Sequence, residues 1–232
     1  MEFVAVTGDI HGEISRIEIF AGYNSTTLKD ILIVLGDAGI NFYGKERDKY
    51  KKEKLKEQDL TIFCIHGNHE MRPQNIDTYV TKEWHGGVVY YEEEYPNILF
   101  AKDGEIYNIN GKSVLVIGGA YSIDKYYRLR MGYPWWEDEQ PSDEIKNYVE
   151  NQLDKVGWKV DIVLSHTCPL KYEPVEWFMA GIDQSMVDKS TEKWLDNIEN
   201  HLEYNKWYCG HFHGEKVIDK VKFMFESIEI MD

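Results

Sequence analysis

The chain has 232 residues, with 26 basic and 41 acidic side chains and a formal net charge of −15 at pH 7. This balance argues against non-specific binding to nucleic acid or to an anionic membrane, because both depend on lysine and arginine neutralising phosphates. The length favours a single domain over residues 1–232 with a sizeable core.

The compartment is expected to be the cytoplasm. The N-terminus lacks a basic region followed by a long apolar stretch, and no apolar run approaches the ~20 residues of a membrane span. The three cysteines, Cys64, Cys168 and Cys209, fit neither a zinc ribbon nor a disulfide framework. We expect them to be small buried side chains near strand ends.

The first seventy residues alternate between apolar and amphipathic segments. Apolar runs at 2–6, 30–35 and 60–65 predict buried strands, and the segments 13–21 and 44–58 predict helices between them. Strands that alternate with helices favour a parallel sheet.

The middle of the chain changes character. Short strands are predicted at 88–91, 98–101, 105–109 and 112–117, and Asn110-Gly111 indicates a tight hairpin between the last two. We expect this part to form a second sheet. Residues 118–141 then mix aromatic and basic side chains without a clean period. A loop of this length is usually functional, so we expect a substrate lid.

The last third returns to helices and strands. Ser142 and Ser190 are expected to cap two helices, because each precedes an apolar stripe at helical spacing. Strands are predicted at 160–164 and 207–209, and residues 215–230 indicate a closing hairpin.

Five short motifs follow these predicted strands. They are Gly8-Asp9-Ile10-His11-Gly12, Gly36-Asp37-Ala38-Gly39, Gly67-Asn68-His69-Glu70, Ser165-His166-Thr167-Cys168-Pro169 and Gly210-His211-Phe212-His213. Open α/β sheets bind ligands at the carboxyl ends of their strands, so the polar side chains should gather there. Carboxylates, imidazoles and an amide suit manganese, iron or zinc better than calcium or magnesium. The ligands suffice for two ions if one carboxylate bridges them, and ions roughly 3.5–4 Å apart can polarise a phosphoryl oxygen together.

The motif order GDxHG, GDxG, GNHE, SHTCP, GHxH resembles the calcineurin-like metallophosphoesterase superfamily, and it spans residues 8–213. The resemblance implies an α/β fold in which a two-sheet β-sandwich is flanked by helices, as a four-layer αββα arrangement. It implies a dinuclear centre at the strand ends, with His69 contacting phosphate or protonating the leaving group. By matching motif, Asp9, His11 and His213 would bind one ion, Asn68, His166 and His211 the other, and Asp37 would bridge them.

The sequence departs from the protein serine/threonine phosphatase branch of that superfamily. That branch has an acid and an arginine where this chain has Ile40 and Asn41, and an arginine where it has His66. Because guanidinium groups match phosphate geometry well, other basic residues are the expected replacement clamps. The candidate substrate-binding residues are His66, Arg72, Lys125, Arg128 and Arg130.

The function expected from these residues is that of a dinuclear metal-dependent hydrolase of phosphoric esters. A metal-bridging hydroxide would attack phosphorus, with Asp37 and His69 as catalytic residues. Phosphomonoesters are favoured, and the alternative is a phosphodiesterase acting on cyclic nucleotides or nucleic-acid ends. A non-catalytic binding module on the same fold is the alternative from another class. The expected cofactors are two divalent ions, Mn²⁺ or an Fe/Mn pair, with Zn²⁺ also compatible. The expected partner is a phosphorylated substrate.

Overall fold

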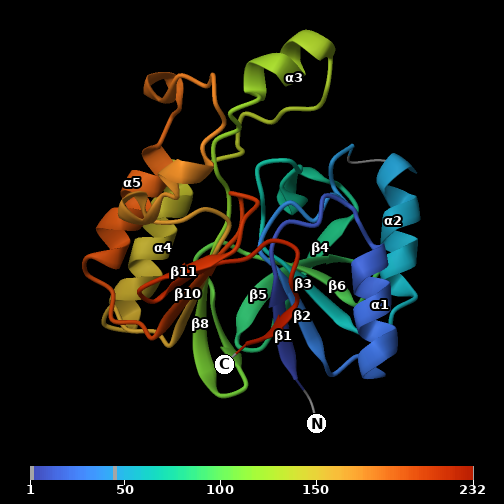
Figure 1. Ribbon diagram of the computed structural model, residues 1–232. Coiled ribbons are helices and arrows are strands. Elements are labelled where there is room, and N and C mark those ends of the chain that lie inside the picture. Colours follow the sequence, from blue (N-terminus) through green and yellow to red (C-terminus); the bar gives the residue numbers. More distant parts are fainter. Residues whose placement is uncertain (1–2, 44–45, 232) are drawn as a thin grey trace.

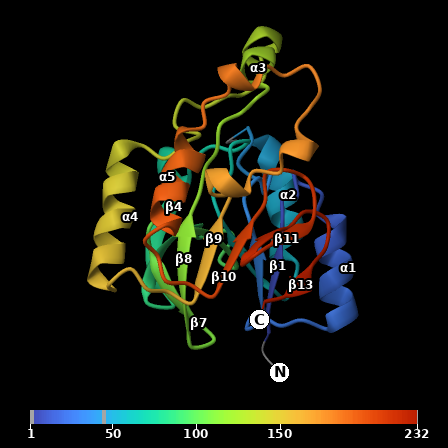
Figure 2. The same ribbon diagram turned by 60° about the vertical axis from the view of Figure 1, so that its left-hand side comes forward.

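Two β-sheets pack face to face and carry helices on both outer faces (Figures 1 and 2). The structure is a computed structural model, and it describes residues 3–43 and 46–231. This arrangement confirms the predicted four-layer αββα fold. No helix within those residues is both long and apolar enough to cross a membrane.

Within the described residues the first sheet has seven strands. Their order is β13 (Glu229–Ile230), β1 (Val4–Thr7), β2 (Ile31–Val34), β3 (Thr61–Cys64), β6 (Ile98–Ala101), β5 (Gly87–Glu92) and β4 (Tyr79–Trp84). Strands β1, β2, β3 and β6 pair in parallel, whereas β13 pairs antiparallel with β1 and β5 pairs antiparallel with β6. The predicted parallel sheet in the first seventy residues is therefore confirmed.

Six strands of the described chain form the second sheet. Their order is β11 (Lys216–Ile218), β12 (Val221–Phe223), β10 (Lys206–Cys209), β9 (Ile162–Ser165), β8 (Lys112–Ile117) and β7 (Ile106–Ile109). Strands β8, β9, β10 and β12 pair in parallel, while the β7–β8 hairpin turns through the predicted Asn110-Gly111. Both sheets thus have parallel centres whose strands end at a common edge.

The helices pack on the sheets through three apolar clusters. One cluster lies between the two sheets, with Phe63 and Ile33 from the first and Val116 and Leu164 from the second. A second cluster packs α1 (Ser15–Asn24) and α2 (Glu46–Lys56) on the first sheet, and a third packs α4 (Asp143–Lys155) and α5 (Ser190–Glu199) on the second. The cysteines lie buried in the structure, as predicted.

The assignment of the middle strands to a second sheet was wrong for two of them. The predicted strands 88–91 and 98–101 became β5 and β6, and β6 joins the first sheet beside β3, with Ile62 opposite Ile98. Strand β6 is buried along its whole length, and a fully apolar run does not reveal which sheet it enters. Strand β4 was not predicted, because it is an edge strand with the exposed polar residues Thr81 and Glu83.

Three smaller expectations have different outcomes. The Ser142 side chain caps α4 by accepting a 3.3 Å hydrogen bond from the backbone N–H of Ile145, as predicted. Ser190 does not cap α5; it is the first helical residue, and its hydroxyl donates to Gln140. The closing hairpin is confirmed for β11 and β12, but the chain then crosses to the first sheet and pairs as β13.

The predicted lid over 118–141 contains a helix that its sequence did not indicate. Helix α3 (Lys125–Met131) stands above one end of the two sheets, beside the segment that precedes α5 (Figures 1 and 2). Much of its apolar surface is exposed, and Tyr126 is 68% exposed. The helix therefore lacks the buried stripe on which a sequence-based prediction depends.

Candidate metal centre

The five motifs meet at the carboxyl ends of the central strands. Asp9 follows β1, Asp37 follows β2, Asn68 follows β3, His166 follows β9, and His211 follows β10. These strands belong to both sheets, so the sandwich itself brings residues more than 200 positions apart to one edge.

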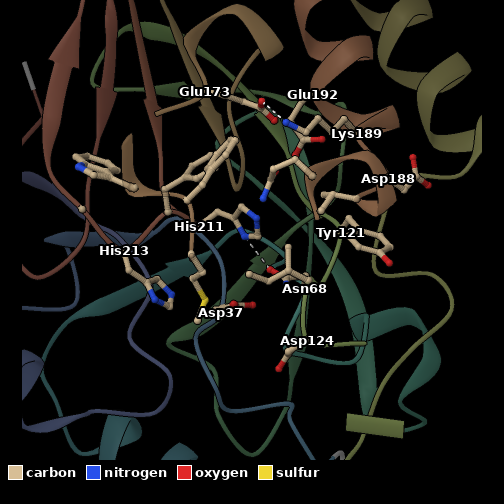
Figure 3. A pocket seen from close by; sticks show the side chains of 18 of the residues that line it. Asp37, Asn68, Tyr121, Asp124, Glu173, Asp188, Lys189, Glu192, His211 and His213 are labelled. Atoms are coloured by element: carbon tan, nitrogen blue, oxygen red, sulfur yellow. Dashed lines mark hydrogen bonds and ion pairs between the residues drawn. The ribbon is translucent and has the colours of Figure 1, made fainter. Parts of the chain in front are cut away.

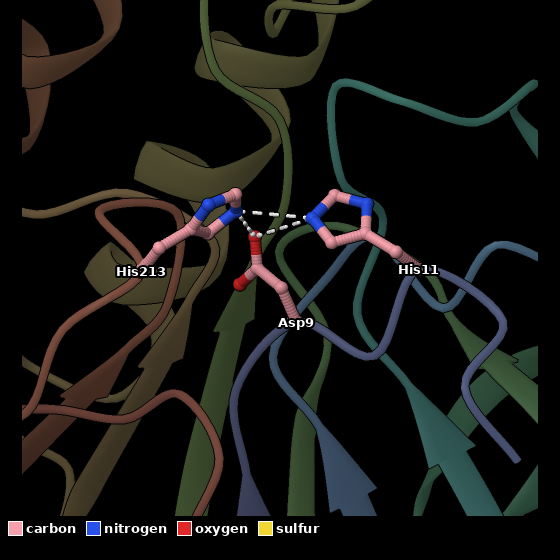
Figure 4. Close-up of side chains that lie close together, drawn as sticks. All are labelled: Asp9, His11 and His213. Carbon is pink, nitrogen blue, oxygen red and sulfur yellow. Dashed lines mark hydrogen bonds and ion pairs between the residues drawn. The ribbon is translucent and has the colours of Figure 1, made fainter. Parts of the chain in front are cut away.

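A first group of ligand atoms comes from Asp9, His11 and His213 (Figure 4). Oδ2 of Asp9 lies 3.2 Å from Nε2 of His213 and 3.8 Å from Nε2 of His11. The two imidazole nitrogens are 3.0 Å apart. The buried Oδ2 of Asp9 thus faces both imidazoles, and the three side chains offer converging ligand atoms to a cation.

A second group lies deeper and contains Asp9, Asp37 and His166, with Asn68 and His211 beside it. Nε2 of His166 is 3.8 Å from Oδ2 of Asp37 and 2.7 Å from Oδ1 of Asn68. Nδ1 of His211 lies 3.1 Å from the same amide oxygen (Figure 3). Because Asp9 contributes to both groups, the two groups adjoin.

The hydrogen bonds around His166 point to a cation in this second group. Its Nδ1 lies 2.8 Å from the carbonyl oxygen of Leu35, so Nδ1 carries a proton, and in the neutral ring that binds a metal Nε2 is an acceptor. The amide nitrogen of Asn68 donates to Oγ of Ser122 at 2.8 Å, which turns its oxygen toward His166. Two acceptors thus face each other at 2.7 Å, and a shared cation removes their repulsion.

Each carboxylate of the cluster has one oxygen fixed by the backbone. The N–H of His211 donates to Oδ1 of Asp9 at 2.8 Å, and the N–H of His69 donates to Oδ1 of Asp37 at 2.7 Å. In both residues Oδ2 is left facing the imidazoles. This orientation positions the ligand atoms before any ion binds.

Glycines in the motifs allow the close approach of these carboxylates. A Cβ atom at Gly67 would lie 2.0 Å from Oδ1 of Asp37, and one at Gly210 would lie 2.3 Å from Oδ1 of Asp9. Both distances are far below van der Waals contact, so any side chain at either position would displace a ligand.

The backbone is strained at four of the predicted ligands. His11, Asp37, His211 and His213 have φ angles of 45°, 46°, 68° and 49°. The left-handed region costs a non-glycine residue on the order of 1–3 kcal/mol, and such strain gathers at functional sites. The sandwich therefore holds these side chains in place at the expense of stability.

Charge interactions shift the pKa values of the cluster in different directions, and the carboxylate of Asp9 raises the pKa of His213 through a hydrogen bond. Burial raises the pKa of Asp9, but His166, His213 and His11 outweigh burial and hold this pKa well below its usual range. Burial and the neighbouring His166 lower the pKa of His211 well below its ordinary value. Asp9 is therefore ionised and His211 neutral at pH 7, as ligands must be.

His69 belongs to neither group of converging atoms. Its ring stands edge-on to His11 at 5.6 Å between centroids, and its Nε2 lies 3.7 Å from Oδ1 of Asp124. Burial lowers the pKa of His69, and the charges of Asp37 and Asp124 oppose that shift. The side chain is 28% exposed, so it is accessible from the space above the cluster.

A cavity of about 870 Å³ opens directly over the cluster (Figure 3). Asp37, Asn68, His69, His211 and His213 line it on the side of the cluster. Tyr121, Ile123 and Asp124 come from the predicted lid, while much of the remaining wall lies between residues 173 and 192. Sequence reasoning missed this wall, although Trp177-Phe178-Met179 was a visible signal, being an apolar stretch outside any predicted element.

The five predicted substrate-binding residues do not line this cavity in the described chain. His66 and Arg72 line a separate cavity of about 160 Å³, and Arg72 pairs with Asp103 at 2.6 Å. The Nζ atom of Lys125 lies 4.0 Å from the centroid of the Trp135 ring, and Arg130 is exposed. Arg128 is buried behind the cluster, where Nη1 reaches Oγ of Ser122 at 3.1 Å and the carbonyl oxygen of Asn68 at 3.4 Å.

Comparison with known proteins identifies the family of the chain. A family model described as calcineurin-like phosphoesterase matches residues 4–215. The chain belongs to the calcineurin-like phosphoesterase family. Membership implies divalent metal ions and a metal-dependent phosphoester hydrolase, and the two groups of converging acceptor atoms fit such ions.

The fold is shared with one solved structure of low sequence identity, and a further structure is similar to the chain. TT1561 of Thermus thermophilus is 13% identical, with a TM-score of 0.52 and coverage of 100% of this chain and 98% of that chain. The phosphopantetheinyl hydrolase PptH of Mycobacterium tuberculosis is 12% identical, with a TM-score of 0.49 and coverage of 97% and 88%. A search of curated proteins gives no match.

Proposed function

We propose that this protein is a phosphomonoesterase that holds two divalent cations in the cluster at the strand ends. The observation that carries the proposal is the convergence of carboxylate, amide and imidazole ligand atoms at the base of a large cavity. Asp9, His11 and His213 would hold one ion, and Asn68, His166 and His211 the other, with Asp37 between them. The mixed oxygen and nitrogen set favours Mn²⁺ or an Fe/Mn pair and is compatible with Zn²⁺.

Bound divalent cations supply the positive charge that polarises a phosphoryl oxygen and lowers the pKa of water. The protein supplies the orientation of the ester and a proton for the leaving alcohol. His69 is placed for the second task, because it borders both the cluster and the cavity. Asp124, 3.7 Å from Nε2 of His69, stabilises the protonated imidazole.

Monoesters are the substrates that we propose, and the space around the cluster has room for their single organic group. Among the described residues one large cavity adjoins the ligand atoms, and the cavity beside His66 and Arg72 is lined by none of them. A monoester has one organic group to place, and the cavity of about 870 Å³ accommodates it.

The test is metal-dependent hydrolysis of two nitrophenyl esters. The protein is stripped with a chelator, reloaded separately with Mn²⁺, Fe²⁺ and Zn²⁺, and assayed with 4-nitrophenyl phosphate and bis(4-nitrophenyl) phosphate. We expect metal-dependent turnover with a higher kcat/KM for the monoester, and loss of both turnover and bound metal in Asp9→Asn. Faster diester hydrolysis would make the protein a phosphodiesterase, and full metal loading without turnover would make it a binding module.

A further inference from the structure

The wall of the large cavity is aromatic close to the candidate metal ligands. Trp177, Phe178 and Phe212 line the cavity together with His211 and His213 (Figure 3). The ring of Phe212 stands edge-on to that of His211 at 5.0 Å between centroids. The organic group of an ester bound at the cluster therefore meets aromatic rings next to its phosphate.

These rings are held in place by their own packing. Phe178 stacks on Phe212 with centroids 6.4 Å apart and planes inclined by 21°, and Trp177 packs edge-on against the buried Phe223 at 5.9 Å. The indole of Trp177 also lies against Gly214, where a Cβ atom would approach it to 2.7 Å. The aromatic wall is thus a preformed surface, as ligand sites usually are.

The rest of the wall carries an excess of carboxylates. The acidic side chains that line the cavity besides Asp37 are Asp124, Glu173, Asp188, Glu192 and Glu215. Lys189 is the one lysine or arginine that lines it in the described chain, and Glu173 pairs with it at 2.6 Å (Figure 3). A second acidic group on a substrate would find no free cation in this wall.

Two of these carboxylates are held by neutral hydrogen-bond donors. Asp188 accepts from the backbone N–H of Ser190 at 2.9 Å and from the amide of Gln140 at 3.0 Å. Glu215 accepts from the backbone N–H of Ser227 at 2.7 Å. Lys146 acts on Asp188 and Arg16 on Glu215 through longer-range charge interactions, which offset part of the negative charge that each carboxylate presents to a ligand.

The chain itself shows how these rings receive a cation. The Nζ atom of Lys189 lies 4.7 Å from the centroid of the Phe178 ring, and that of Lys216 lies 5.0 Å from the centroid of the Trp177 ring. Aromatic faces attract ammonium groups through the ring quadrupole, and neighbouring carboxylates add to that attraction. Because Lys189 and Lys216 already lie over these two rings, the carboxylates of the wall are the groups that would attract the amine of a ligand.

We propose that the substrate is a phosphate ester of a bulky, largely apolar alcohol that carries an amine and has no acidic group besides the phosphate. The proposal rests on the function proposed above. The phosphate would lie at the cation cluster, the apolar body against Phe178 and Phe212, and the amine beside one of the wall carboxylates, Asp188 or Glu215. Polyphosphorylated substrates and nucleic acids are excluded by the acidic wall.

The test uses three phenyl phosphates of nearly equal size that differ at the para position. The substituents are 2-aminoethyl, ethyl and 2-carboxyethyl. All three leaving groups are para-alkyl phenols with similar pKa values, close to about 10. Differences in kcat/KM therefore report recognition of the substituent and not the chemistry of the leaving group. We expect the amine ester to be favoured over the carboxylate ester by at least about tenfold.

Three variants assign this preference to residues. The double substitution Asp188→Asn with Glu215→Gln should bring the ratio of amine to carboxylate ester close to one. Asp183→Asn is the matched control, because Asp183 lies on the same segment but is exposed and does not line the cavity. It should keep the ratio of the unaltered protein. Phe178→Ala should lower kcat/KM for all three esters by a similar factor, since each places its ring against this wall.

The outcomes separate this inference from the function on which it rests. Equal kcat/KM values for the three esters, or preference for the carboxylate ester, would overturn the inference and leave a metal-dependent phosphatase. An unchanged ratio in the double variant would also overturn it. No hydrolysis of any of the three esters by the metal-loaded protein would instead remove the proposed function itself.

Discussion

The backbone N–H of His69 donates a 2.7 Å hydrogen bond to Oδ1 of Asp37. The other carboxylate oxygen of Asp37 faces Nε2 of His166 at 3.8 Å. One carboxylate thus positions both the candidate proton donor and the deeper ligand group. We expect substitutions at the two residues to have different effects, because one side chain would hold metal and the other would move a proton.

Loss of the Asp37 charge should disturb both ions. We expect Asp37→Asn to lower metal content at both sites and nearly abolish hydrolysis, because an amide offers one oxygen where the carboxylate offers two. Elemental analysis after reloading with Mn²⁺ measures the effect. Asp183→Asn is a suitable control, since Asp183 is exposed and belongs to neither ligand group, and this variant should retain both ions. Full occupancy of Asp37→Asn with normal turnover would rule out the bridging role.

Removal of the His69 imidazole should leave the metal content intact. We expect His69→Ala to lower kcat by about 10²–10⁴-fold, the usual contribution of a positioned acid. The loss should be smaller for 4-nitrophenyl phosphate than for an alkyl phosphate, because nitrophenolate leaves without much help from a proton.

Two measurements distinguish this role from others for His69. Steady-state kinetics can be measured with a series of esters whose leaving groups differ in pKa. As the leaving-group pKa rises, kcat should fall more steeply in His69→Ala than in the unaltered protein. A parallel dependence would contradict proton donation. Loss of one ion in the variant would instead make His69 a ligand, against its position outside both ligand groups.

The candidate metal centre was predictable because each of its residues is tied to a strand end. An apolar run followed by glycine and an acid or histidine places a side chain at the carboxyl edge, and both sheets share that edge. For His66 the position at a strand end does not predict where the side chain points. It lies at the same edge, yet its side chain points into the smaller cavity, and only the packing around Gly118 and Asp103 determines this.

The features that were not predictable depend on contacts distant in sequence. Strand β6 has the same apolar pattern whether it joins the first sheet or the second, and its pairing with β3 decides the matter. The cavity wall around Trp177 and Phe178 has short 3₁₀ turns without periodicity. Its place in the cavity wall depends on packing against Phe212 and Gly214, which lie far away in the sequence.

Substitutions of the two arginines of α3 should affect catalysis differently, because the two side chains point in different directions from the helix. Arg128 is buried against Asn68 and Ser122, and in the described chain its Nη2 has no hydrogen-bond partner. Arg130 is exposed. We expect Arg128→Met to lower metal affinity and kcat/KM by about 10–100-fold, because Arg128 supports Ser122 and Asn68 and does not reach the substrate cavity. Arg130→Ala, the matched control, should stay within about twofold. Equal effects of the two substitutions would contradict this separation.

Stability should depend on pH through Glu192. This side chain is 4% exposed and accepts a 2.8 Å hydrogen bond from Thr167, and burial raises its pKa from 4.5 to about 7. Between these two values the folded protein keeps a proton that the unfolded chain has released. The free energy of unfolding therefore falls as pH rises through this window and levels off above about 7.

Replacement of Glu192 by glutamine should remove this pH-dependent fall in the free energy of unfolding. The amide stays neutral at every pH, and its oxygen can still accept a hydrogen bond from Thr167. We compare the free energy of unfolding of Glu192→Gln with that of the unaltered protein. This difference should shift in favour of the variant by about 2 kcal/mol from pH 5 to pH 8. Urea denaturation in metal-free buffer at both pH values measures the difference. Glu137→Gln, at an exposed position, should show no such gain. A difference that is the same at both pH values would show that Glu192 is already ionised in the folded protein at pH 5.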